Sequence, residues 1–151
     1  MQKGHGQVAH QLLAIIDAQA TAFLKFTQAN RFHVLPGGDF EVSGFDDLLG
    51  DVRSKYPFLD TSQSERLVRS YGLKALEILG DAETADDLGE DFDHGLTEAE
   101  VRYLITSEWA MVADDVLWRR SKLGIRMSRK QTARLEAFMN DYKQQHNLAA
   151  E

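Results

Sequence analysis

The segment that decides the fold is residues 96–124, which opens with LTEAEVRYLI and closes with DDVLWRRSKLG. Thr97 and Glu100 have the spacing of a capping box, in which a threonine and a glutamate three residues later satisfy the first amides of a helix. The apolar residues that follow recur at helical spacing. An acidic pair, Asp114 and Asp115, then leads into a basic cluster beside Trp118. The segment therefore predicts a helix from Thr97, followed by a charged surface.

Capping and stop signals predict further helices on either side. A serine or threonine followed three residues later by glutamate or glutamine marks a helix start, and glycine or proline marks an end. Residues 1–31 carry apolar side chains at separations of three and four, which is typical of one amphipathic helix. The other predicted helices run from Ser43 to Tyr56 before Pro57, from Ser62 to Gly72, from Leu73 to Gly80, and from Ser128 past Tyr142.

Strand signals are almost absent. The short stretches 32–35 and 40–42 could pair as one hairpin across the Pro-Gly-Gly turn at 36–38, although a lone hairpin is marginally stable. We therefore predict an all-α fold, a compact bundle of six or seven helices with at most this one short N-terminal hairpin. The expected organisation is an N-terminal helix over 1–31, a helical domain over 32–145 and a frayed tail over 146–151.

Composition limits the classes of function. The chain has 151 residues, enough for one domain, and its net charge of −7 argues against general affinity for nucleic acid or anionic lipid. It contains no cysteine, which excludes disulfides and thiolate chemistry and suits a reducing compartment. No apolar stretch approaches the ~20 residues of a membrane span, and no secretory signal is evident. These features lead us to expect a cytoplasmic protein.

Motifs for metal or cofactor binding are missing. The stretch 81–100 holds nine carboxylates and no lysine or arginine, but the spacing after Asp91 fails as a calcium loop, so a solvated acidic loop is expected. The histidines lack metal-ligand spacing: His5 and His10, for example, are five residues apart. The chain also lacks a phosphate-binding loop and a Gly-x-Gly-x-x-Gly fingerprint. We assign no metal and no cofactor to this chain.

The basic segment from Trp118 to Arg134 has seven lysines and arginines and no acid. Three interpretations remain open: an anion or nucleic-acid surface, a helix end whose dipole favours cations, or ion pairs from Asp114 or Asp115 to arginines four and five residues later. The net charge speaks against nucleic acid. Trp109 and Trp118, nine residues apart, are expected in the core rather than on a ligand-binding surface.

Several segments taken together resemble one family, the FAD-dependent glycerol-3-phosphate dehydrogenases of bacteria and mitochondria. Their order and spacing over residues 32–145 are similar to the helical C-terminal cap domain of these enzymes, and the last segment is the most specific. The segments are VLPGG at 34–38, YPFL at 56–59, RSYG at 69–72, DLG at 87–89, EAEVRY at 98–103 and DDVLWRRSKLG at 114–124.

The resemblance implies a parent enzyme that oxidises sn-glycerol 3-phosphate to dihydroxyacetone phosphate and passes electrons through FAD to quinone. It places that parent at the inner face of the cytoplasmic membrane, with the flavin and substrate sites in a larger preceding domain. No catalytic or FAD-binding residue carries over to this chain. Alone it is expected to be inactive and to pack against the FAD domain, with self-association as an option and membrane contact only through the parent. The expected docking surface is Asp115, Trp118, Arg119, Arg120 and Lys122.

A second hypothesis is a free-standing protein-interaction module that keeps the cap fold. The N-terminal stretch 1–31 motivates it, because these residues match the family poorly.

Overall fold

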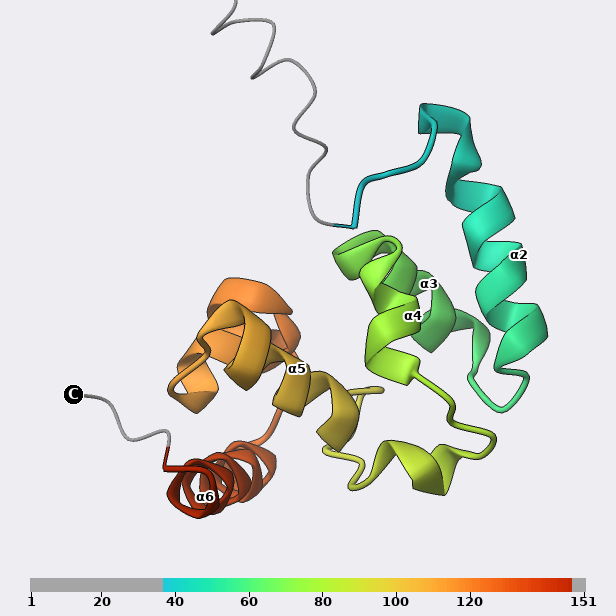
Figure 1. Cartoon of the computed structure of the whole chain (residues 1–151). Coiled ribbons are helices and arrows are strands. Elements are labelled where there is room, and N and C mark those ends of the chain that lie inside the picture. Colours follow the sequence, from blue (N-terminus) through green and yellow to red (C-terminus); the bar gives the residue numbers. More distant parts are fainter. Residues whose placement is uncertain (1–36, 148–151) are drawn as a thin grey trace, which may run out of the picture. The chain divides into compact units, whose positions relative to one another are not determined.

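The computed structural model describes residues 37–147, and within them helices form without a strand (Figure 1). The elements in chain order are η1 (Val42–Gly44), α2 (Phe45–Lys55), α3 (Thr61–Tyr71), α4 (Lys74–Leu79), η2 (Ala85–Leu88), α5 (Glu98–Glu108), η3 (Asp115–Arg120), η4 (Leu123–Ile125) and α6 (Arg129–Gln145). η3 is a π-helix, and the other η elements are 3-10 turns. The predicted all-α class is confirmed.

The first core lies between α2, α3 and α4, which run side by side in Figure 1. Apolar residues three and four apart place one face of each helix inward, and burying that face supplies most of the stability of a short helix. The buried residues of this core are Leu48, Leu49, Val52, Tyr56, Leu67, Val68, Ala75, Leu79 and Leu88.

The second core joins α5, η3, η4 and α6. η3 is wider than an α-helix: the amide of Ser121 donates to the carbonyl of Val116, five residues earlier, at 2.9 Å. Such π-turns are rare and recur at functional sites. The buried residues of this core are Phe92, Leu96, Val101, Leu104, Ile105, Ala110, Ala113, Val116, Leu117, Leu123, Leu135 and Met139.

Most predicted helix ends are confirmed. α3 stops at Gly72 and α4 at Gly80, both with positive φ, and Tyr56 ends α2 just before Pro57. Ser128 and Gln131 form the complete capping box at the start of α6. These signals are local, since each depends on residues within one turn of the helix end.

Two predicted helix starts and one predicted capping bond need correction. Ser43 does not cap α2, because it lies within the 3-10 turn and Gly44 takes the N-cap position. Ser62 lies inside α3, which begins at Thr61 because the carboxylate of the N-cap residue Asp60 accepts the amide of Gln63 at 2.7 Å. Thr97 does precede α5, but its side chain makes no capping hydrogen bond.

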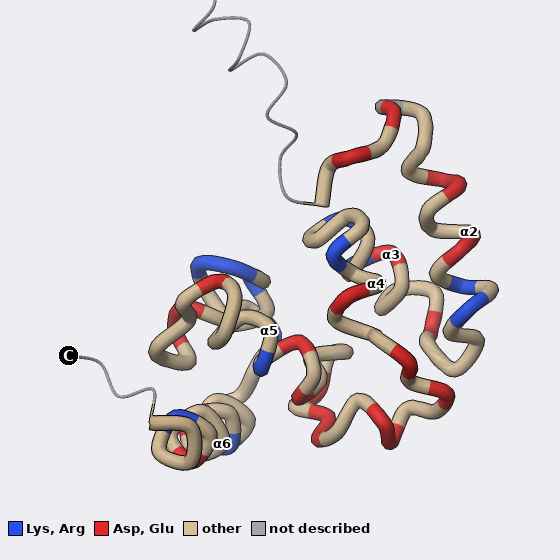
Figure 2. Tube along the Cα trace, viewed as in Figure 1, with Lys and Arg blue, Asp and Glu red and all other residues tan. Residues whose placement is uncertain are grey.

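The acidic stretch is more ordered than the predicted solvated loop. Thr84 and Asp87 form a capping box on η2, and Glu98 and Glu100 belong to α5. Figure 2 shows carboxylates along this stretch and basic residues mainly elsewhere. Glu100 is fully buried, which contradicts the expectation that these carboxylates are solvated.

The predicted N-terminal hairpin is wrong for its second arm, residues 40–42. Val42 lies in the turn η1 and not in a strand, while the opposing arm 32–35 and the predicted helix over 1–31 fall outside the described residues. The same holds for 148–151 of the predicted tail. The boundaries 1–31, 32–145 and 146–151 stay a prediction. No helix in the part of the chain that the structure describes is long and apolar enough to cross a membrane.

Candidate functional site

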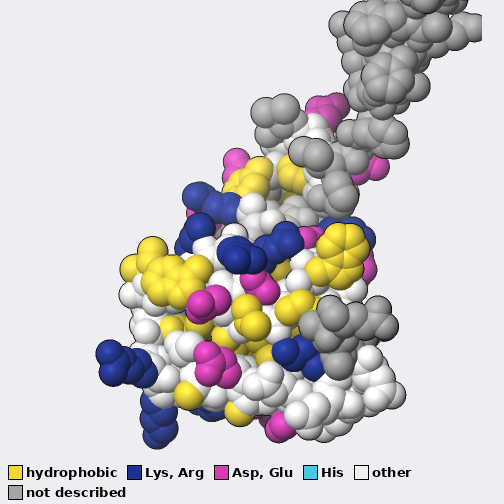
Figure 3. Space-filling model, turned by 90° about the vertical axis from the view of Figure 1, so that its left-hand side faces the viewer, with side chains coloured by type: hydrophobic (Ala, Val, Ile, Leu, Met, Phe, Trp, Pro, Cys, Tyr) yellow, Lys and Arg dark blue, Asp and Glu magenta, His cyan; other side chains and the backbone are white. Residues whose placement is uncertain are grey.

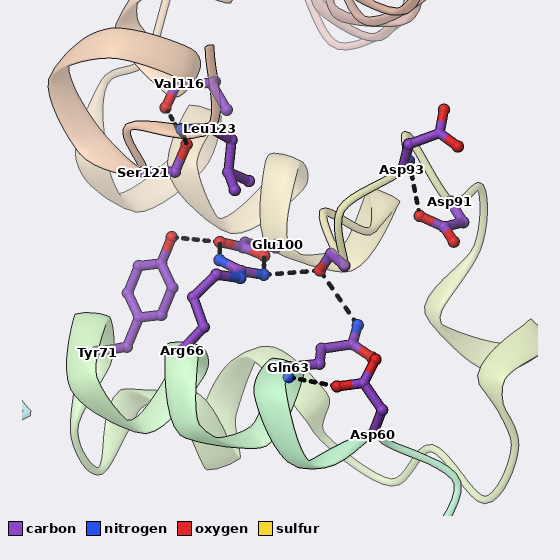
Figure 4. A network of polar contacts seen from close by, with 11 residues as sticks. Asp60, Gln63, Arg66, Tyr71, Asp91, Asp93, Glu100, Val116, Ser121 and Leu123 are labelled. Atoms are coloured by element: carbon purple, nitrogen blue, oxygen red, sulfur yellow. Dashed lines mark hydrogen bonds and ion pairs between the residues drawn. The ribbon is translucent and has the colours of Figure 1, made fainter. Parts of the chain in front are cut away.

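A buried ion pair links α3 to α5 (Figure 4). The guanidinium of Arg66 donates Nη1 to Glu100 Oε1 at 2.7 Å and Nη2 to Glu100 Oε2 at 2.6 Å. Nη2 also donates to the carbonyl of Gly95 at 2.6 Å. The Glu100 side chain is inaccessible to solvent and that of Arg66 is 18% exposed. This bidentate geometry is the strongest form of ion pair that proteins use.

Tyr71 completes the network by donating its hydroxyl to Glu100 Oε1 at 2.7 Å. Burial raises the pKa of Tyr71 well above its ordinary value, and the nearby carboxylate raises it further because a second negative charge would be repelled. Burial opposes the charge on Arg66, but its hydrogen bonds and attraction to Glu100 win and raise its pKa. Tyr71 therefore stays neutral and Arg66 stays charged near neutral pH.

This arrangement is structural rather than catalytic. Arg66 donates to both oxygens of Glu100, whose side chain is inaccessible to solvent, whereas a general base must reach its substrate. Among the described residues there is no group of three acidic or histidine side chains that could hold a metal ion. The Glu100 carboxylate thus joins two helices. Because Arg66 binds it, it does not accept the Thr97 amide as the capping box predicted.

Asp115, one of the five predicted docking residues, binds the backbone of the segment that precedes η3. Its Oδ2 accepts the amides of Met111 at 2.9 Å and Val112 at 3.2 Å, and its Oδ1 pairs with Arg119 at 2.8 Å. Burial opposes ionisation of Asp115, but the two amides and Arg119 prevail and lower its pKa. The predicted i,i+4 pair is therefore present, and Asp115 orders this turn.

The three basic residues of the predicted docking surface make different contacts. Arg120 donates Nη1 to Glu108 Oε2 at 2.6 Å and Nη2 to the Glu108 carbonyl at 2.8 Å, so it ties η3 to the end of α5. Lys122 donates its ammonium to the carbonyl of Trp118 at 2.5 Å. The Arg119 side chain is 79% exposed although it pairs with Asp115, so it lies where a partner could contact it.

The two tryptophans are not core residues, which corrects the sequence-based expectation. Trp109 is 84% exposed and Trp118 is 47% exposed, with Val112 and Ile125 also at the surface. Trp118 packs against Gly124, where an added Cβ would lie 2.5 Å from its ring. Hydrophobicity alone misplaced both residues. On the face shown in Figure 3, hydrophobic side chains reach the surface among lysine and arginine side chains.

Two shallow hollows lie along α6 and share Glu136 as a wall. The first, of 310 Å³, lies between Val112 and Met139. The second, of 330 Å³, lies between Trp118 and Met127. Both hollows have mixed apolar and polar linings, as protein contact surfaces commonly do.

Comparison with known proteins places the geometry in context. The family described as the C-terminal domain of alpha-glycerophosphate oxidase matches residues 28–150. The aerobic glycerol-3-phosphate dehydrogenase of Escherichia coli (strain K12) is 44% identical over 112 residues, which are 74% of this chain and 22% of that protein.

Two further relatives give the same picture. The glycerol-3-phosphate dehydrogenase of Pseudomonas aeruginosa is 38% identical over 105 residues, 70% of this chain and 20% of that protein. The D-erythritol 1-phosphate dehydrogenase of Brucella abortus is 34% identical over 88 residues, 58% of this chain and 18% of that protein. The chain thus spans about a fifth of the length of the curated relatives it matches.

Proposed function

The chain belongs to the family of C-terminal domains of alpha-glycerophosphate oxidase, and we propose that it serves as the helical C-terminal domain of an FAD-dependent glycerol-3-phosphate dehydrogenase. The observation that carries the proposal is the family match over 28–150 combined with the small share of each relative that the chain spans. The parent would oxidise sn-glycerol 3-phosphate to dihydroxyacetone phosphate, with the flavin passing electrons to quinone.

The described residues do not fit FAD themselves. A dinucleotide is usually held by a glycine-rich turn between a strand and a helix, with its pyrophosphate at the helix N-terminus. Residues 37–147 contain no strand, and side chains of this chain already cap α3 and α6 through Asp60 and Ser128. These features support placing flavin and substrate in the other part of the parent, with no reacting group supplied by this domain.

The proposed role of the domain is to pack against the flavin- and substrate-binding part. Arg119, Trp118 and Lys122 are exposed on one short stretch and supply polar and aromatic contacts, while Asp115 and Arg120 hold that stretch in shape. Membrane contact at the inner face of the cytoplasmic membrane would come through the parent. Self-association of the domain is the other contact this surface could make.

Spectroscopy and turnover of the purified chain test the proposal. The chain, incubated with FAD and desalted, is expected to show no flavin absorbance and no reduction of a dye acceptor by glycerol 3-phosphate. The aerobic dehydrogenase of Escherichia coli serves as the positive control. Bound flavin together with substrate-dependent turnover in the chain alone would refute the proposal, because both would then reside in this domain.

A further inference from the structure

The link between α5 and η3 holds a large apolar side chain in solvent. Trp109 has φ 54° and ψ 38°, the left-handed conformation, and its side chain is 84% exposed. It occupies the position just after a helix where glycine is the usual residue, because a Cβ is disfavoured there. Neither burial nor backbone geometry accounts for a tryptophan at this position.

The backbone around Trp109 is fixed from the α5 side. The amide of Ala110 donates to the carbonyl of Leu104, six residues earlier, at 2.9 Å, and this bond closes the end of α5. Arg120 binds both the side chain and the carbonyl of Glu108, the residue immediately before the tryptophan. The left-handed turn is therefore held by three hydrogen bonds and does not depend on the indole ring.

The following residues are fixed from the other side. Asp115 accepts the amides of Met111 and Val112, and Lys143 of α6 donates to the carbonyl of Met111 at 2.6 Å. Ala113 is buried in the second core, as is Ala110. The link thus buries its two alanines and leaves Trp109 and Val112 outside, the latter 54% exposed. We call these two side chains the Trp109/Val112 patch.

Two carboxylates beside the patch are paired within the domain, and a third, Asp114, is exposed and lines the hollow beside Val112. Glu108 is neutralised by Arg120 and Asp115 by Arg119. An anionic lipid surface or a nucleic acid would need unpaired cations at the point of contact, so the patch suits an uncharged, apolar receptor. An exposed tryptophan on a fixed backbone is typical of the residues that dominate binding energy at protein interfaces.

Building on the proposed function, we propose that the Trp109/Val112 patch inserts into an apolar pocket on the flavin- and substrate-binding part of the parent enzyme. The length of the curated relatives supports this receptor, because about four fifths of each protein lies outside the matched region and is available to contact the domain. Beside the patch, the 310 Å³ hollow between Val112 and Met139, which Asp114, Glu136 and Asn140 also line, can accept a side chain of the receptor in return. Arg120 and Asp115 act as positioning residues, because they hold the backbone on either side of the patch.

The first arm of the test uses the full chain alone and the substitution Trp109→Gly. Glycine relieves the left-handed strain, and little buried contact is lost, so the Tm of the chain rises by about 3–6 °C. Val112→Ser leaves the Tm nearly unchanged. A tryptophan that stabilises the fold by packing would give the opposite sign, and a fall in Tm for Trp109→Gly would overturn the proposal.

The second arm joins residues 28–150 to the Escherichia coli dehydrogenase in place of its own matching region. Flavin release on heating, followed by flavin fluorescence, reports how well the two parts hold together. Trp109→Gly and Val112→Ser lower the temperature of flavin release and weaken docking about tenfold or more, although the first stabilises the domain itself. Arg53→Ala, an exposed truncation on α2, is the matched control and has no effect.

The outcomes separate the two proposals. A chimera that retains flavin and turns over, with Trp109→Gly indistinguishable from the unsubstituted chimera, overturns the patch and spares the proposed function. A folded chimera without flavin or turnover overturns both. Sedimentation of the chain provides the last check: a dimer that Trp109→Gly converts to a monomer would assign the patch to a second copy and contradict the proposal.

Discussion

Glu100 of α5 and Arg66 of α3 form a two-pronged ion pair that bridges the two cores of the domain, although the residues are 34 positions apart in sequence. Tyr71, whose ring packs against both cores, donates to the same carboxylate. Because the pair is buried, removing one member leaves the other charge without compensation, and this penalty exceeds what the intact pair contributes.

Glu100→Gln tests this bridge. The amide keeps the shape of the side chain but leaves the buried guanidinium of Arg66 unpaired, so the free energy of unfolding falls by about 3 kcal/mol. Urea denaturation of the purified chain measures it. Glu77→Gln, which breaks an exposed pair with Lys74, is the control and changes the free energy by less than about 0.5 kcal/mol. Equal effects of the two substitutions would argue against the bridge.

The start of α3 gives a second prediction. Asp60→Ala removes the carboxylate that accepts the Gln63 amide and lowers the free energy of unfolding by about 1 kcal/mol. Ser62→Ala, at the position that sequence spacing favoured as the cap, is neutral or slightly stabilising because it lies inside the helix. A larger loss of unfolding free energy for Ser62→Ala than for Asp60→Ala in urea denaturation would show instead that Ser62 is the cap.

The pH dependence of stability tests the role of Asp115. Its pKa lies below the ordinary value of 3.8, so the ionised group stabilises the fold above that value and this stability is lost as pH falls through the folded-state pKa. Asp115→Asn is therefore less stable than the unsubstituted chain at pH 7, and the difference disappears once the pH lies below the folded-state pKa of Asp115. A difference that persists or grows on acidification would show that the charge is not responsible.

The contact between Gly124 and Trp118 gives a fourth prediction. A Cβ at Gly124 would lie 2.5 Å from the indole, so Gly124→Ala displaces the ring and destabilises the domain by about 1–3 kcal/mol. Gly50, in the middle of α2, has open space around it, and Gly50→Ala stabilises by about 0.5–1 kcal/mol. Thermal unfolding of both variants measures the pair. A destabilised Gly50→Ala would show that helix propensity is not the deciding effect there.

The sequence predicted the helical class and those helix ends that depend on neighbouring residues alone. Gly72 and Gly80 supply the positive φ that ends a helix, and Ser128 with Gln131 closes its box within one turn. Glu100 had the right spacing for a box, yet a cation 34 residues away in sequence took its carboxylate. A local pattern cannot register such competition from a distant residue.

The candidate surface was only partly predictable. The pair of Asp115 with Arg119 follows from i,i+4 spacing, and it is present. The exposure of Trp109 is invisible to hydrophobic patterning, since a tryptophan nine residues from another suggests a core position. Its left-handed backbone is held by the Ala110 amide and by Arg120, and Arg120 reaches Glu108 from the π-helix η3. That extra residue per turn has no signature in a 3.6-residue period.

The most direct measurement of the central claim is glycerol 3-phosphate oxidation by the chimera in which residues 28–150 replace the matching region of the Escherichia coli dehydrogenase. Turnover with a dye acceptor is expected within about tenfold of the natural enzyme, since the domain holds no reacting group and its role is to pack. The isolated chain, assayed beside it, gives no turnover. A folded chimera that holds no flavin, or an isolated chain that oxidises the substrate, would contradict the account.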